Sequence, residues 1–226
     1  QKKRKRRNES FMTMKGYPRI IRDKGEMWMP KETFFNLSNA KKQRIDDLLL
    51  EIFCSQHISQ VKVSEIVDKM GMSRGAFYKY FQDLEDAYLY TIKSSSHIVH
   101  QDILKFISEN KQHFFLGIEK YLEWCCDLDH ESIYWQRLYL LTQRNDQQTT
   151  KRRELSADSP MNEKWLELLR INHFSIQSSE EAVSFLYFSM TLVMNTLTDL
   201  IANNWTKEEL LKDFRYKSRW IAEGIQ

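Results

Sequence analysis

The chain has 226 residues, of which 42% are hydrophobic and 13% aromatic, and this supplies a buried core for one large or two small globular domains. Because it has only 6 glycines and 3 prolines and lacks sustained β-branched alternation after Val63, the composition predicts an all-α fold. No run of about 18 apolar residues is evident and no apolar segment follows the basic N-terminus, so we expect no membrane span, no secretory signal and a cytoplasmic location.

The net charge of +3 is unevenly distributed along the chain. Residues 1–28 contain ten Lys or Arg and three acidic residues, a balance of +7, so residues 29–226 carry 3 − 7 = −4. A mildly acidic body disfavours strong nonspecific attraction to nucleic acid. The local placement of cations therefore matters more than the total charge.

Residues 1–35 are predicted to form a flexible basic leader. The KKRKRR run at Lys2–Arg7 is typical of a nuclear-import or polyanion-binding tail, whereas Met29 followed by Pro30 is typical of a natural start. Three interpretations stay open for residues 1–28: non-native translated upstream sequence, an arm that grips DNA, and a localisation signal. We expect disorder in each case.

A long helix is predicted to begin at Ser38 or Asn39 and to end near Gln56. Its apolar face is formed by Ile45, Leu48, Leu49, Ile52 and Phe53. Three cations lie near the start of this helix, namely Lys41, Lys42 and Arg44. Either all three are solvated side chains of the first turn, or at least one of them contacts the DNA backbone.

Val63 to Phe81 is predicted to form two short helices joined by a tight turn. Apolar residues recur at helical spacing in the first helix, at Val63, Ile66, Val67 and Met70. Gly71 suits the sharp reversal after a helix end, and Ser73 can cap the next helix. Phe77 and Phe81 lie four residues apart and are expected to face the same core. This layout indicates a helix-turn-helix unit that reads DNA.

Candidate DNA contacts lie mainly on the outer side of the second helix. Arg74 can pair with a guanine edge, Gly75 and Ala76 permit close approach, and the remaining residues are expected to hold phosphates. The complete predicted set is Lys62, Ser64, Ser73, Arg74, Gly75, Ala76, Tyr78, Lys79 and Tyr80.

This stretch resembles the N-terminal domain of the TetR family of bacterial transcriptional regulators. The similarity rests on Gly71-Met72-Ser73 and Phe77-Tyr78-Lys79-Tyr80-Phe81, and it extends over about Asn36–Ile92. It implies a three-helix head over residues 36–83 and a helical effector-binding and dimerisation domain over 84–226. It further implies a homodimer that binds double-stranded DNA at a near-palindrome, acts most commonly as a repressor and is released by a small-molecule effector.

Two departures from the family pattern affect what is expected. Val67 and Met70 stand where the family usually has alanine, which indicates different packing. Leu84 stands where the family commonly has a phosphate-contacting lysine, so one expected backbone contact is missing. An alternative function is therefore a coactivator of the same fold whose C-terminal domain binds a protein partner.

After the reading unit, a helix is predicted to begin after Asp83, to have a second carboxylate at Asp86, and to continue to about Ser96. Five or six further helices are expected, separated by breaks near Asn110, Asp127–Glu131, Asn145–Thr150, Ser156–Pro160, Ile171–Gln177 and Asn203–Trp205. Helix starts are indicated at Ser159-Pro160 and by the capping-box spacings at Ser178/Glu181 and Thr206/Glu209.

Ser179–Asn203 is the best candidate for self-association, because it is apolar on several faces. The alternative is a central core helix. The predicted dimer interface, as the resemblance implies for the last two helices, consists of Val183, Leu186, Met190, Val193, Leu197, Leu200, Phe214 and Ile221.

The middle of the chain is rich in aromatic residues, which suit the walls of an effector pocket but equally suit ordinary core packing. The candidate pocket residues are Tyr121, Trp124, Trp135, Tyr139 and Met190.

No cofactor, metal site or enzymatic activity is predicted. His97 and His100 lie three residues apart, but two ligands do not make a metal site. The three cysteines, Cys54, Cys125 and Cys126, lack zinc-type spacing, so buried or incidental thiols are favoured over a redox-sensing pair. No phosphate-binding loop, dinucleotide glycine pattern or nucleophile elbow occurs, so an enzyme would need an aromatic cavity without a local motif.

Overall fold

The computed structural model describes residues 30–143, 160–176 and 178–224, and within these ranges every regular element is helical. One short 3-10 helix, η1, accompanies the α-helices. The elements are α2 (Glu32–Phe35), α3 (Asn39–Ser55), η1 (Ile58–Gln60), α4 (Val63–Met70), α5 (Arg74–Tyr80), α6 (Leu84–Glu109), α7 (Phe114–Cys126), α8 (Ile133–Thr142), α9 (Pro160–Ile171), α10 (Ser179–Ala202) and α11 (Lys207–Glu223). The prediction of an all-α fold is confirmed.

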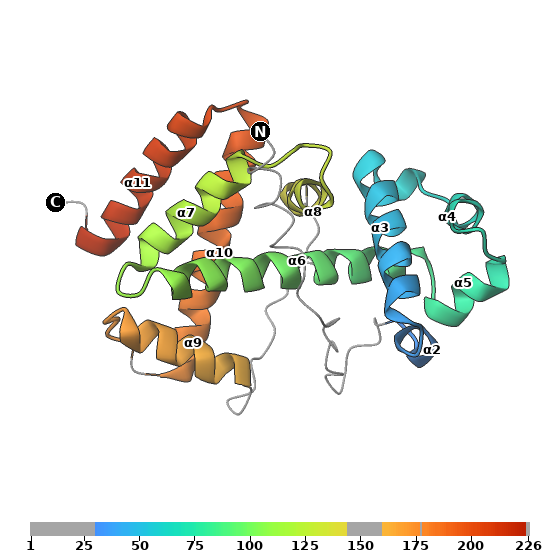
Figure 1. Cartoon of the computed structure of the whole chain (residues 1–226), viewed down its shortest axis with the longest axis horizontal. Coiled ribbons are helices and arrows are strands. Elements are labelled where there is room, and N and C mark those ends of the chain that lie inside the picture. Colours follow the sequence, from blue (N-terminus) through green and yellow to red (C-terminus); the bar gives the residue numbers. More distant parts are fainter. Residues whose placement is uncertain (1–29, 144–159, 177, 225–226) are drawn as a thin grey trace, which may run out of the picture.

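The helices form a small head and a larger body that are joined by α6 (Figure 1). The head contains α2 to α5, and α3 packs against α4, α6 and α8. The body contains α7 to α11, with α7 packed along α6 and α10 in contact with α7, α8, α9 and α11. The two ends of α6 therefore belong to different parts of the molecule.

The predicted helix-turn-helix unit is confirmed in its boundaries and in its turn. Ile66, Val67 and Met70 of α4 are buried. Gly71 ends α4 in the left-handed region at φ 61°, which favours glycine because no Cβ is present to clash. The Ser73 hydroxyl caps α5 by accepting a hydrogen bond from the Ala76 N–H at 3.2 Å. Phe77 is fully buried and turns α5 toward the head core.

The segment before α3 belongs to the head, so the predicted leader over residues 1–35 extends too far. Residues 1–29 lie outside the described ranges, whereas Lys31–Phe35 are placed against α5. Phe34 has no exposed surface, and its ring lies 5.3 Å from that of Phe81 and 5.0 Å from that of Tyr90. The head therefore begins no later than Pro30, rather than at residue 36.

Helix α6 is longer than predicted. Its start at Leu84 is as expected, with the Asp83 carboxylate accepting from the Asp86 N–H at 2.8 Å. The predicted end near Ser96 was wrong, because Ser94 and Ser95 are buried within the helix, which continues to Glu109. Small side chains in a packed interior do not end a helix when apolar residues continue on the same face.

Close packing of α7 on α6 depends on Gly117. A Cβ atom at this position would lie 2.5 Å from the Ile107 Cα and 2.9 Å from the Phe106 carbonyl oxygen. Both of those atoms are backbone, so a larger side chain would push the helices apart.

Helix α10 is a long and strongly apolar element of the body. Its best 18-residue window has a mean hydropathy of 1.3, so by length and composition alone it could cross a membrane. The sequence analysis recognised this segment as apolar on several faces but found no continuous run of about 18 apolar residues, because polar residues such as serine and threonine interrupt it. The helix packs against four neighbours, and several of its apolar side chains are half-buried, namely Val183, Phe185, Leu186, Leu192 and Met194. Among the large apolar side chains of α10, Phe188 alone is exposed.

Candidate nucleic-acid interface

The outer face of α5 presents two cations and an aromatic side chain to solvent. Arg74, Gly75 and Lys79 are exposed, and Tyr78 is 40% exposed. A Cβ at Gly75 would meet only the Ser73 hydroxyl, at 3.9 Å, so the surface over this residue is open. Of the other predicted contacts, Lys62, Ser64 and Ser73 are exposed and Ala76 is half-buried.

The C-terminal end of α5 is held by the segment that precedes α3. The Lys31 N–H donates to the Tyr80 carbonyl at 2.8 Å, and the Lys31 Nζ donates to the Tyr78 carbonyl at 2.7 Å. The Thr33 hydroxyl donates to the Lys79 carbonyl. Three carbonyls that a helix end would otherwise leave without partners are thus satisfied by another element.

Lys31 and Thr33 were missed as functional positions at the sequence level. Helix α2 has only four residues, which is too short for a periodic pattern. The available signal was the pair Phe34-Phe35, since two adjacent aromatic residues are unusual in a solvated leader.

Tyr80 differs from its predicted role as an outward-facing phosphate contact. Its side chain is half-buried, with its ring 6.1 Å from that of Phe34, and the Lys41 ammonium lies 5.7 Å from the ring centroid. Tyr80 therefore packs at the edge of the head, and its ring lies within cation–π distance of the exposed Lys41.

The basic first turn of α3 divides into different environments. Lys41 and Arg44 are exposed, whereas Lys42 is buried and donates to the Phe35 carbonyl at 3.0 Å. Lys42 is therefore unavailable as a DNA contact. Leu84, at the position where a phosphate-contacting lysine was expected, is partly buried and packs on the hydrophobic core.

Five of the eight predicted dimer-interface residues lie in the core of the protomer, so their assignment was wrong. These residues are Met190, Val193, Leu197, Leu200 and Phe214, all at most 8% exposed. Val183, Leu186 and Ile221 are half-buried. The residues of α10 that were predicted from their spacing lie on the side of the helix that faces its neighbours in the same protomer. Because α10 is apolar on several sides, spacing alone could not show which side is free for a partner.

Large apolar side chains are exposed elsewhere on the last two helices. Phe188 of α10 is 46% exposed, and Tyr216 and Trp220 of α11 are 41% and 43% exposed. The Tyr216 and Trp220 rings are nearly parallel, with centroids 6.4 Å apart. These three residues are called the α10–α11 aromatic face below.

The five residues predicted to line an effector pocket lie in unlike surroundings. Tyr121 is fully buried, its hydroxyl 3.2 Å from that of Tyr134, and Met190 is also buried. Trp124 packs on Tyr134 at 4.7 Å, Trp135 stacks on His130 at 4.0 Å, and Tyr139 is 37% exposed. The aromatic residues thus act largely as packing groups.

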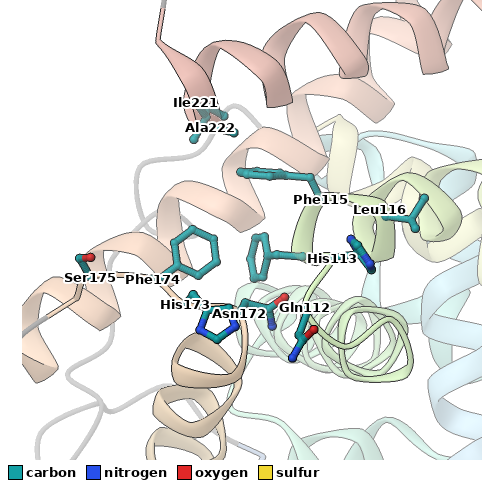
Figure 2. A pocket seen from close by; sticks show the side chains of 11 residues that line it. Gln112, His113, Phe115, Leu116, Asn172, His173, Phe174, Ser175, Ile221 and Ala222 are labelled. Atoms are coloured by element: carbon teal, nitrogen blue, oxygen red, sulfur yellow. The ribbon is translucent and has the colours of Figure 1, made fainter.

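A cavity of about 540 Å³ lies at another place, and none of those five residues lines it. It is bounded by the turn between α6 and α7, the connection from α9 to α10, and the end of α11. Figure 2 shows the rings of Phe115 and Phe174 beside it, with Asn172, His173 and Gln112 grouped at one end. The Asn172 Oδ1 atom is buried and has no hydrogen-bond partner among the described residues.

The cysteines show no pairing and little nucleophilic character. All three are free, and burial raises the pKa of the Cys125 and Cys126 thiols and raises that of Cys54 to about 12. Thiols with raised pKa values stay protonated and react slowly, which disfavours redox sensing. Within the described ranges, no group of three or more His, Cys, Asp or Glu side chains could hold a metal ion.

An exposed, cationic second helix of a helix-turn-helix unit on a helical body defines the class of DNA-binding transcription regulators. A model of the tetracyclin repressor-like C-terminal domain matches residues 113–225, half of the 226-residue chain. The chain belongs to the TetR family of transcriptional regulators.

Two of the solved structures to which this chain is similar are regulators of the TetR type. A TetR family transcriptional regulator from Chloroflexus aurantiacus J-10-fl is 21% identical, with 86% of this chain and 91% of that chain covered and a TM-score of 0.42. A TetR transcriptional regulator from Rhodococcus sp. RHA1 is 10% identical, with 83% and 97% covered and a TM-score of 0.45. No curated protein matches significantly.

Proposed function

We propose that the protein is a cytoplasmic, homodimeric repressor that binds a near-palindromic operator and is released by a small-molecule effector. Each protomer places α5 in a major groove, and the twofold axis sets the two helices about 34 Å apart along the duplex. The observation that carries this proposal is the exposed face of α5, on which Arg74 and Lys79 stand free of the head core.

The roles of the two cations differ because of their positions on α5. Arg74 follows the Ser73 cap at the start of the helix, where recognition helices usually meet base edges. Lys79 lies in the last turn of α5, where its carbonyl accepts the hydrogen bond from the Thr33 hydroxyl. At this position a contact to a DNA phosphate is favoured over a contact to a base edge. Arg74 is therefore assigned to base reading and Lys79 to the DNA backbone.

Alanine substitutions at these two positions are expected to weaken DNA binding in different ways. Arg74→Ala should cost about 1–3 kcal/mol on the specific duplex and relax base preference, whereas Lys79→Ala should weaken all sequences and reduce the salt dependence. Gel-shift titrations of both variants on specific and scrambled duplexes over a range of salt would separate these effects. Equal, sequence-independent losses would contradict the assigned roles.

Dimerisation is proposed to use the α10–α11 aromatic face. Phe188 on α10 and Tyr216 and Trp220 on α11 are the exposed large apolar side chains of these two helices, and Val183, Leu186 and Ile221 are half-buried. Exposed aromatic clusters of this kind usually mark protein interfaces. Pairing this face with its copy about a twofold axis would cover it and align two heads.

A charge placed on this face is expected to separate the protomers. Phe188→Asp combined with Trp220→Asp should convert a dimer into a monomer in analytical ultracentrifugation, because two carboxylates would be buried without partners. Leu116→Asp is the matched control, since Leu116 is 41% exposed but lies on α7. A dimer that survives the double substitution, or that is lost in the control, would place the interface elsewhere.

The small-molecule effector is proposed to bind in the cavity beside Phe115 and Phe174. The described lining combines aromatic rings with amide and imidazole groups and includes no lysine, arginine or carboxylate. An uncharged or weakly polar ring compound with a hydrogen-bond donor for Asn172 suits this lining. Compounds that raise the melting temperature and release bound duplex would identify the effector, and Asn172→Leu should reduce both responses.

A further inference from the structure

One helix of the body, α8, touches the head directly. It packs against α3, the long helix of the head, and against α6, which joins the two parts (Figure 1). The Cys54 thiol on α3 lies 3.1 Å from the Gln136 carbonyl oxygen on α8. Helix α8 is therefore in direct contact with a helix of the head that also packs against α4 of the helix-turn-helix unit.

A buried arginine lies in the middle of this junction. Arg137 of α8 is only 5% exposed, and its Nη1 donates to the hydroxyl of Ser95 on α6 at 3.3 Å. Its Nη2 lies 4.0 Å from the Asp47 carboxylate on α3. One guanidinium thus meets both of the helices against which α8 packs in this region.

The facing side of α3 carries two neighbouring carboxylates. Asp46 is 5% exposed and accepts a hydrogen bond from the Tyr90 hydroxyl of α6 at 2.8 Å. Burial raises the pKa of Asp46 to about 7, although Tyr90, Arg137 and Lys42 oppose this rise and Asp47 adds to it. Burial also raises the pKa of Asp47, whereas Gln43 and Arg137 lower it. The junction therefore contains charges whose balance depends on the position of Arg137.

Lys42 also faces this cluster, but its position is fixed by the head. Its ammonium donates to the Phe35 carbonyl, and both residues belong to the head itself. Arg137 is the cation in this cluster that the body supplies. A buried guanidinium without partners is strongly unfavourable. We therefore expect Arg137 either to keep its contacts with α3 and α6 or to leave them fully, with few intermediate positions.

We propose that Arg137 is the positioning residue through which the effector-binding body holds the DNA-reading head in one orientation, and that displacement of α8 lowers operator affinity by withdrawing this guanidinium from Asp46 and Asp47. The proposal rests on the proposed function as a DNA-binding regulator. It assigns a mechanical role to a residue that belongs neither to the reading helix α5 nor to the lining of the cavity.

Two measurements on the full-length protein test this role. Hydrogen exchange followed by mass spectrometry reports how firmly α3 is held, and it needs no DNA. Affinity is measured on the duplex that the unmodified protein selects from a random-sequence pool. Arg137→Met is expected to speed exchange in α3 and to weaken binding to that duplex by about tenfold, while exchange in α10 stays unchanged.

Arg215→Met is the matched control. Arg215 pairs with Glu119 at 2.7 Å between α11 and α7, and its side chain is 61% exposed. This pair joins two helices of the body, so its loss should change neither readout.

The pH dependence distinguishes positioning from a general loss of stability. Operator affinity of the unmodified protein is expected to change near neutral pH, as Asp46 gains or loses its proton, and Asp46→Asn should flatten this profile. In Arg137→Met the midpoint should move to higher pH, because the cation that favours the ionised carboxylate is gone.

Defined outcomes would overturn the proposal. The proposal is overturned if Arg137→Met shows the same hydrogen exchange in α3, the same DNA affinity and the same pH profile as the unmodified protein. If Arg137→Met does not fold, Arg137→Gln replaces it: faster exchange in α3 together with weaker binding supports the proposal, and no change in either readout overturns it. If the unmodified protein selects no duplex, the proposed function fails, and the exchange measurement still decides whether Arg137 holds the head.

Discussion

Replacing Phe34 with alanine is expected to lower the free energy of unfolding by about 3–5 kcal/mol, the usual cost of deleting a fully buried phenylalanine. The ring has no exposed surface and packs against Phe81 and Tyr90. Its loss would also loosen α2, which supplies the Lys31 and Thr33 hydrogen bonds to the end of α5. Specific DNA binding should therefore fall together with stability.

Urea unfolding followed by circular dichroism measures this effect, and gel-shift titration measures the loss of binding. Phe35→Ala is the matched control, because Phe35 is the adjacent residue on the same short helix but is only half-buried. Its cost should be clearly smaller. A loss below about 1 kcal/mol for Phe34→Ala would show that α2 is an appendage rather than part of the head core.

Replacing Asp46 with asparagine is expected to stabilise the protein above neutral pH by about 4 kcal/mol, the equivalent of the shift in pKa from 3.8 to about 7. The unfolded chain ionises near the lower value and the folded protein near the higher one. Between them the unfolded state binds fewer protons, so stability falls as the pH rises through this window. Asparagine cannot ionise, and it keeps an oxygen for the Tyr90 hydroxyl.

Urea unfolding at a series of pH values from 4 to 8 tests this expectation. The curves for the two proteins should approach each other toward the ordinary aspartate pKa of 3.8 and diverge up to about pH 7. Asp68→Asn, which removes an exposed carboxylate on α4, is the control for the effect of losing one negative charge at the surface. Parallel curves for Asp46→Asn and the unmodified protein would contradict the assigned cause.

The reading unit could be predicted from sequence because its information is local. Spacing alone placed Ile66, Val67 and Met70 on one face, and Gly71 and Ser73 have backbone roles that neighbouring residues define. The capping box at Thr206 was predicted for the same reason, and both of its hydrogen bonds are present. Signals of this kind survive without knowledge of the tertiary structure.

The features that were missed depend on contacts between distant segments. Helix α2 is too short to show a period and is held through contacts to residues more than 40 positions away. The junction at Arg137 brings together side chains of three helices. Along α10, apolar residues occur on every side, so spacing could not show which side faces the protomer core. The aromatic composition likewise predicted rings in the body but not the cavity beside Phe174.

The uninterrupted course of α6 has a consequence for how small a change can control DNA binding. With 26 residues it is about 39 Å long, and it reaches from the cavity end of the body to the head. A stiff rod of this length acts as a lever: a tilt of about 5° at one end displaces the other by about 3 Å, close to the rise of one base pair. In the proposed dimer, a slight rearrangement beside the proposed effector cavity would thus put the two reading helices out of step with the grooves.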